Sequence, residues 1–159
     1  MPDVLVGIAL GSNMGDRSLE LDAAIWFLRS LACQGMVRES PRIETMPVDC
    51  PPGSPPFLNS VAELEVDSVM FPPLNLFACL EEFECERGRS LIRDHNAPRP
   101  LDLDIIYYGI ERFDHMGLII PHPRAHQRRF VLEPLSHLRP DFVLPGQKKT
   151  VKQLLAELK

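Results

Sequence analysis

The sequence contains no long apolar run and no excess of basic residues. Its longest clean apolar stretch, residues 4–10, is far shorter than the roughly 20 residues that a membrane-spanning helix needs. Asp3 precedes this stretch and no basic segment does, so we expect no secretion signal. The net charge of −5 argues against a nucleic-acid-binding surface over the whole molecule. We therefore expect neither a membrane nor a nucleic-acid partner.

The cysteines are few and lack the spacing of a metal site. None of Cys33, Cys50, Cys79 and Cys85 forms a C-x-x-C pair, which favours reduced thiols in a cytoplasmic protein over a zinc site. The 159 residues, 45% hydrophobic and 25% charged, are typical of one globular domain spanning residues 1–159. We see no repeat and no linker, and we expect a monomer.

The spacing of apolar residues predicts an α+β fold. Strands are expected near residues 4–10, 37–45, 57–66 and 98–109, and helices near 17–33 and 73–87. The order strand, helix, strand, strand, helix, strand is that of a ferredoxin-like β-α-β-β-α-β antiparallel sheet with helices on one face. A C-terminal extension follows, with a short strand near 118–120, helical turns over 128–138 and a final helix capped by Thr150 and Gln153.

Two carboxylates interrupt the last predicted strand of this sheet. In PRPLDLDIIYYG, Asp102 and Asp104 alternate with Leu101, Leu103 and Ile105 and so share one face. Two neighbouring carboxylates repel each other, and a divalent cation such as Mg²⁺ would offset that repulsion. The alternative is a strand with one wet face and two ordinary surface aspartates.

Basic residues gather in two places of this acidic chain. Arg87, Arg89, Arg93 and Arg99 crowd one segment, and Arg124, Arg128 and Arg129 another. The pattern favours a small anionic ligand over DNA, although for either cluster alone a solvated charged face is the favoured interpretation.

Several motifs in a fixed order carry a family resemblance. They are ALGSNMGDR, ETMPVDCPPGSPPFLN, EEFECERGR, APRPLDLDIIYYG and IPHPRAHQRRFVLEPL. With them, the chain resembles the 6-hydroxymethyl-7,8-dihydropterin pyrophosphokinases of folate biosynthesis across nearly its whole length. The resemblance implies an ATP-binding transferase that moves pyrophosphate from ATP to the pterin hydroxymethyl group and releases AMP.

The resemblance also implies roles for individual residues on the nucleotide side. Asp102 and Asp104 match the ligands of two Mg²⁺ ions that bridge the triphosphate. The other matching nucleotide or catalytic positions are Glu84, Arg89, Arg99, Ile105, His122 and Arg128.

On the pterin side, the resemblance implies a stacked ring with amide partners at its rim. The matching positions are Thr45, Pro47, Val48, Phe57, Asn59 and Phe130, with Phe57 and Phe130 as the stacking pair. For either phenylalanine alone, core packing is the competing interpretation.

Some positions depart from the family pattern. Leu91 and Asn96 stand where the family often has an arginine and a tryptophan, and Asp49 replaces a usual glycine. Arg93 is a candidate substitute for the absent arginine. These departures leave open a binding protein that keeps both pockets but transfers slowly. A ferredoxin-like RNA-binding module is the other alternative, but the chain lacks the exposed strand aromatics and basic sheet face that it needs.

Overall fold

The computed structural model describes residues 3–46, 52–88 and 100–158. Its elements follow the chain as β1 (Asp3–Ser12), α1 (Arg17–Leu31), β2 (Val37–Glu39), β3 (Ile43–Thr45), β4 (Phe57–Asp67), α2 (Pro73–Glu86), β5 (Asp102–Tyr108), β6 (Phe113–His115), β7 (Leu118–Ile120), α3 (Arg129–Leu138) and α4 (Val151–Glu157). Short 3₁₀ helices lie at Cys33–Gly35 and Ala125–Gln127.

The main sheet is antiparallel, with strands in the order β2-β4-β1-β5 and with β3 also paired to β4. The single strand predicted over residues 37–45 is two strands, because Pro41 has no N–H to give to the ladder. Ser40 bridges this interruption: its N–H donates to the Val61 carbonyl at 2.9 Å, and its hydroxyl accepts from the Val61 N–H at 2.9 Å.

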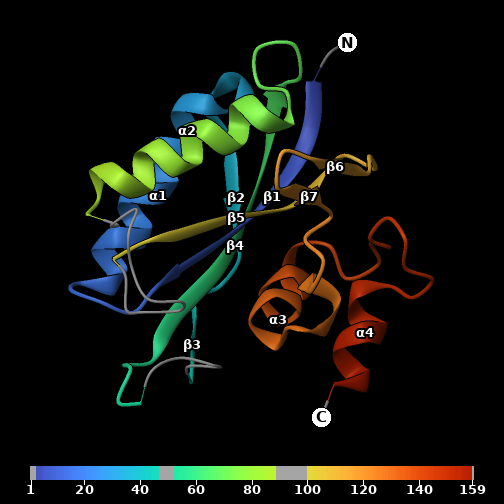
Figure 1. The fold of residues 1–159 in the computed structure, drawn as a ribbon. Helices are drawn as coiled ribbons and strands as arrows, with labels where there is room; N and C mark the ends of the chain where they lie inside the picture. Colours follow the sequence, from blue (N-terminus) through green and yellow to red (C-terminus); the bar gives the residue numbers. More distant parts are fainter. Residues whose placement is uncertain (1–2, 47–51, 89–99, 159) are drawn as a thin grey trace.

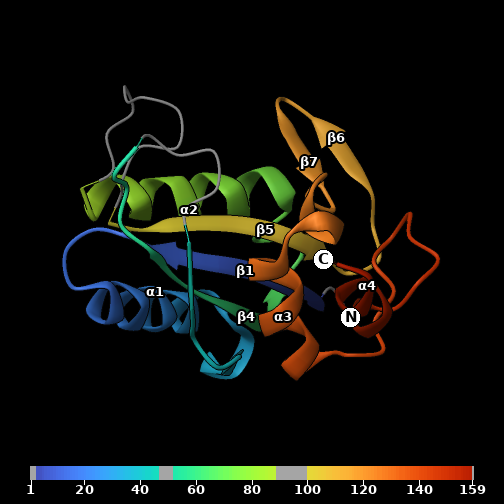
Figure 2. The ribbon, with the colours of Figure 1, turned by 90° about the horizontal axis from the view of Figure 1, so that it is seen from below.

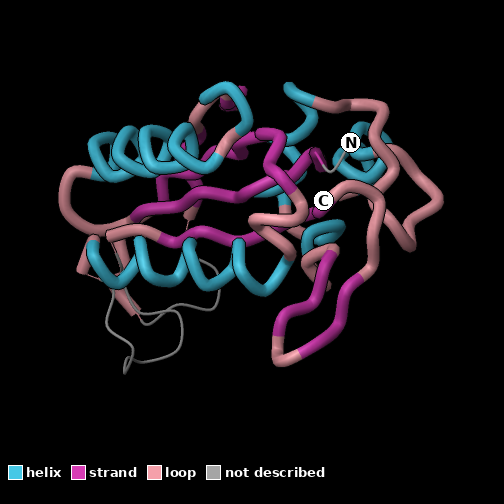
Figure 3. Tube along the Cα trace, turned by 90° about the horizontal axis from the view of Figure 1, so that it is seen from above, coloured by secondary structure: helices cyan, strands magenta, loops and turns pink. Residues whose placement is uncertain are grey.

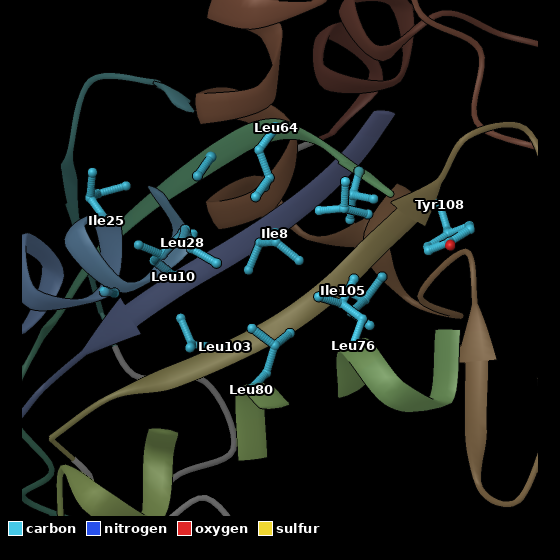
Figure 4. Packing of buried hydrophobic residues seen from close by; sticks show 14 of the residues in the cluster. Ile8, Leu10, Ile25, Leu28, Leu64, Leu76, Leu80, Leu103, Ile105 and Tyr108 are labelled. Carbon is cyan, nitrogen blue, oxygen red and sulfur yellow. The ribbon is translucent and has the colours of Figure 1, made fainter. Parts of the chain in front are cut away.

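Helices cover both faces of the sheet: the two of the β-α-β-β-α-β unit share one face, as expected, and those of the C-terminal extension lie on the other. α1 and α2 lie over one face, whereas α3 and α4 lie across the other (Figures 1 and 2). On the first face, apolar side chains of both helices, such as Leu28 and Leu76, pack against strand residues such as Ile8 of β1 (Figure 4). The second face buries Leu132 and Leu135 of α3 against Val61. Figure 3 shows a β6–β7 hairpin projecting from one end; β6 was not expected.

Side-chain caps begin two of the helices, α1 and α4. The Asp16 carboxylate accepts from the Leu19 N–H at 3.2 Å and begins α1. Thr150 and Gln153 form the predicted capping box of α4. No helix in the described residues is both long and apolar enough to cross a membrane.

A bulge in β5 breaks its alternation between the two faces. The register against β1 shifts between Gly7 and Ile8. As a result Ile105 packs into the cluster under α1 and α2, whereas Ile106 and Tyr107 both pack into the cluster under α3. The bulge thus adds an aromatic side chain to the face that also carries Asp102 and Asp104.

Candidate functional site

Three strands bring the predicted pterin and metal residues onto one line. Gly11 of β1 lies opposite Asn59 of β4 on one side and opposite Asp102 of β5 on the other. Directly opposed residues share a face, so Asn59 and Asp102 point to the same side of the sheet. At about 4.7–4.9 Å per strand, their backbones lie about 10 Å apart.

The two aspartates share the face that the alternation predicts. Leu103 and Ile105 pack into the cluster under α1 and α2, so Asp102 and Asp104 point toward the opposite face. Both are half-buried, and Asp104 lies opposite Ala9 of β1. Both opposing positions of β1, Gly11 and Ala9, carry small residues.

Glu84 supports the strand that carries the aspartates. Its side chain is 4% exposed, and Oε2 accepts from the Leu103 N–H at 2.7 Å. Leu103 lies between Asp102 and Asp104, on the edge strand of the sheet. The carboxyl group therefore fixes the outer edge of β5 between the two candidate metal ligands. The family resemblance implies a place for Glu84 at the nucleotide site, and no pattern in the sequence indicates this backbone contact.

Asn59, a predicted pterin residue, is held in a fixed orientation. It is 5% exposed, and its Nδ2 donates to the Thr45 hydroxyl at 2.5 Å. A Cβ added at Gly11 would lie 3.0 Å from Asn59 Oδ1 and 3.6 Å from Phe57 Cδ1. The absence of a side chain at Gly11 therefore gives the amide and the Phe57 ring the space that they occupy.

His122 stands between the basic residues near α3 and the aspartates. The backbone N–H of His122 donates to the Ile106 carbonyl at 2.9 Å, and the ring Nδ1 accepts from the backbone N–H of Arg124 at 3.2 Å. Burial, and after it the charges of Arg128 and Arg124, lower the pKa of His122 to about 4, and Asp102 opposes part of this shift. The imidazole is therefore neutral at neutral pH and offers a hydrogen bond rather than a charge.

Arg128 and Phe130 lie at the start of α3, beside β3 and β4. The Arg128 guanidinium lies 5.2 Å from the centre of the Phe130 ring. Phe130 is half-buried against the cluster under α3, so part of its ring is accessible. This places an arginine and an aromatic ring together on the same side of the sheet as Asn59 and Asp102.

An open pocket of about 380 Å³ is bounded by the turn after β1, Glu44 of β3 and the segment before β4. Arg17 joins the two sides: it donates to the Pro56 carbonyl at 3.1 Å and to Glu44 at 2.8 Å. Neither Arg17 nor Glu44 was predicted as a site residue, although Arg17 ends the motif ALGSNMGDR. Their contacts hold the backbone next to Phe57.

Five predicted site residues are not placed with their side chains at this site by the described structure. Arg89, Arg99, Pro47 and Val48 lie outside the described residues. The side chain of Ile105 packs against the helices on the other face, so a nucleotide would meet its backbone and not its side chain.

The two aspartates suit a hard cation whose remaining ligands come from a bound substrate. No group of three or more His, Cys, Asp or Glu side chains in the described parts of the chain could hold a metal ion. Asp102 and Asp104 offer two carboxylates on one face, which matches Mg²⁺ held by one or two carboxylates plus substrate phosphates.

Comparison with known proteins gives a family and close relatives. The model of the 7,8-dihydro-6-hydroxymethylpterin-pyrophosphokinase (HPPK) family matches residues 7–140. The 2-amino-4-hydroxy-6-hydroxymethyldihydropteridine pyrophosphokinase of Haemophilus influenzae is 36% identical over 151 residues, which is 95% of this chain and 88% of that protein. The Bacillus subtilis protein of the same name is 36% identical over 132 residues, 82% of this chain and 75% of the relative.

Solved structures show the same fold. A Plasmodium falciparum HPPK-DHPS structure with pteroate aligns with a TM-score of 0.74 at 12% identity and covers 98% of this chain. An HPPK-DHPS described as in complex with substrates aligns with a TM-score of 0.78 at 11% identity over 98% of this chain. The chain spans 43% of each of these solved chains.

Proposed function

This chain belongs to the 7,8-dihydro-6-hydroxymethylpterin-pyrophosphokinase family, and we propose that the sheet face around Gly11 binds both of its substrates. The enzyme transfers a pyrophosphoryl group from ATP to the hydroxymethyl group of 6-hydroxymethyl-7,8-dihydropterin, in folate biosynthesis. The pterin oxygen bonds to the β-phosphorus and loses its proton. The bond from that phosphorus to the oxygen bridging to the α-phosphate breaks, and AMP leaves.

The observation that carries the proposal is the row Asn59–Gly11–Asp102 across three strands. It puts an oriented amide, suited to a polar heterocycle edge, about two strand spacings from a carboxylate suited to a metal–triphosphate. Phosphoryl transfer depends mainly on such alignment and on charge stabilisation, so no side chain needs to act as a strong base.

Asp102 and Asp104 are the residues that would hold two Mg²⁺ ions. When bound, the ions would neutralise triphosphate charge and favour the in-line displacement. Arg89, Arg99, Arg128 and His122 are assigned to the phosphates, for which a planar guanidinium provides two donors at once. The neutral state of His122 suits a hydrogen bond to a phosphate oxygen without adding a buried charge.

The pterin half of the site is assigned to the β4 side of Gly11, where Asn59 lies. Phe57 and Phe130 would cover the two ring faces, and Asn59, oriented by Thr45, would read the ring edge. The backbone at Pro47 and Val48 completes this assignment. Ile105 contributes its backbone to the nucleotide.

Release of AMP from ATP and Mg²⁺, with and without hydroxymethyldihydropterin, tests the proposal. Asp102→Asn and Asp104→Asn keep the side-chain shape and should each remove most pterin-dependent release. Asp114→Asn, on the exposed face of β6, is the matched control and should leave it unchanged. Near-full turnover in either site variant would refute the metal assignment. Tight binding of both substrates without AMP release in the unaltered protein would favour the slow or inactive binding protein instead.

The proposal extends to the architecture. The order β2-β4-β1-β5 in an antiparallel sheet supports a ferredoxin-like topology, with α3 and α4 as an added layer. We also propose that residues 1–159 form one domain and that the protein is a monomer in the cytoplasm. Sedimentation of the purified protein tests the monomer.

A further inference from the structure

A buried polar cluster outside the substrate site lies under the far end of α3. Glu63 of β4 is 3% exposed, and its Oε2 accepts a hydrogen bond of 2.5 Å from the Tyr107 hydroxyl. Arg38 of β2 lies 3.2 Å from Glu63 Oε1, and Arg139 at the end of α3 lies 3.5 Å from Oε2. These four residues, termed here the anchor cluster, come from four different elements.

The sheet is shaped to let this contact form. Gly7 of β1 lies opposite Glu63 on one side and opposite Tyr107 on the other. A Cβ at Gly7 would lie only 2.5 Å from Tyr107 Cζ. The tyrosine ring therefore lies across β1 and reaches a carboxylate two strands away, which any larger residue at position 7 would prevent.

The anchor cluster binds the C-terminal end of α3 to the sheet. Arg139 stacks over the Phe142 ring at 3.8 Å and lies 5.5 Å from the centre of the Tyr107 ring. Arg38 also donates to the carbonyl of Leu138, the last residue of α3, at 3.4 Å. The helix end is thus fixed by directional bonds to β2 and β4 and by ring contacts with β5.

The other end of the same helix carries Arg128 and Phe130. Phe130 lies eight residues before Leu138, which at 1.5 Å per residue is about 12 Å along the axis. Between these ends, α3 contacts the sheet through apolar side chains such as Leu132 and Leu135. Apolar contacts are non-directional and permit small rotations of a helix, whereas hydrogen bonds fix its direction.

We propose that the anchor cluster positions Phe130 and Arg128 over the substrates by fixing the rotation and slide of α3. The inference rests on the proposed function, because it assumes that these two residues meet the pterin and the transferring group. Stability alone gives little reason for such a cluster, since apolar side chains of similar volume often stabilise a core as well as buried charges do.

Tyr107→Phe is the sharpest test, because it removes one hydroxyl and keeps the ring. The matched control is Tyr108→Phe, which removes the hydroxyl that donates to the Phe71 carbonyl at 2.8 Å on the other face of the sheet. With Tyr107→Phe we expect pterin Kd to rise about tenfold and kcat to fall, because a hydrogen bond to a charged group is lost. ATP Kd should change much less, and Tyr108→Phe should leave pterin Kd and kcat unchanged.

A second variant keeps the test open if Tyr107→Phe fails to fold. Arg139→Lys retains the charge at a part-exposed position but loses the planar group that stacks on Phe142, and it should shift pterin Kd in the same direction. If both variants lower the melting temperature and leave pterin Kd and kcat unchanged, the cluster is structural and the inference is wrong.

Phe130→Ala separates the inference from the proposed function. If it weakens pterin binding while Tyr107→Phe does not, the site stands and the positioning role fails. If Phe130→Ala leaves pterin binding unchanged, both the site assignment and the positioning role fail.

Discussion

Replacing Glu84 by alanine should destabilise the protein and weaken its response to Mg²⁺. The substitution removes the acceptor of the Leu103 N–H, a contact of 2.7 Å made by a side chain that is 4% exposed. A buried donor left without its acceptor costs about 1–3 kcal/mol. Taking about 2 kcal/mol, the melting temperature of a domain of this size should fall by about 4–8 °C.

The same change should loosen the strand segment that carries Asp102 and Asp104. Supporting groups around metal ligands typically contribute ~10–100-fold to metal affinity, and Glu84 acts through the backbone, so we expect the low end. The Mg²⁺ concentration that gives half-maximal AMP release should therefore rise about tenfold.

Thermal unfolding and a Mg²⁺ titration of AMP release measure the two effects separately. Glu81→Ala, on the exposed side of the same helix, is the control and should change the free energy of unfolding by less than about 0.5 kcal/mol. Glu84→Gln keeps an acceptor oxygen and should lie between the two. A Glu84→Ala protein that melts like Glu81→Ala would refute the hydrogen-bond argument, and a lower melting temperature with an unchanged Mg²⁺ response would refute the link to the aspartates.

Three further predictions concern the other parts of the site. Burial, Arg128 and Arg124 lower the pKa of His122 to about 4 from 6.5, so as the pH falls His122 is protonated in the unfolded chain before it is protonated in the folded one. The free energy of unfolding should therefore fall from about pH 6.5 toward pH 4, and His122→Ala should flatten this part of a profile of melting temperature against pH. Gly11→Ala puts a Cβ 3.0 Å from Asn59 Oδ1 and should raise pterin Kd more than ATP Kd in a calorimetric titration. Phe57→Ala should also act on the pterin, by at least about 0.5–1.5 kcal/mol from lost stacking, and equal losses for both ligands would indicate general destabilisation instead.

The parts of the fold that depend on local chemistry could be predicted from the sequence. Thr150 and Gln153 cap α4 because the side chain of each accepts from the backbone N–H of the other, three residues away, and Asp102 and Asp104 share a face because a strand has a period of two. Both predictions need only a few neighbouring residues. The family resemblance supplied the roles of these groups, which the period alone does not.

The contacts that support the site could not be predicted, because they join distant residues. Glu84 meets the Leu103 backbone 19 positions away, and Glu63 meets Tyr107 44 positions away. The bulge at Ile106 also leaves no trace in the pattern, since Ile106 and Tyr107 are both apolar enough to suit either face. Likewise, the apolar positions of α3 require a buried face without saying which side of the sheet provides it.

The row Glu63–Gly7–Tyr107 has a consequence for how this sequence can change over time. The tyrosine ring occupies the volume where a side chain at position 7 would be, and the carboxylate is buried in part by the ring that it binds. A larger residue at position 7 is tolerated only after Tyr107 has become smaller, and a smaller residue at 107 leaves Glu63 with Arg38 and Arg139 but without the tyrosine hydroxyl. Positions 7 and 107, far apart in the sequence, should therefore be replaced together, so that relatives with a larger residue at position 7 carry a smaller one at 107.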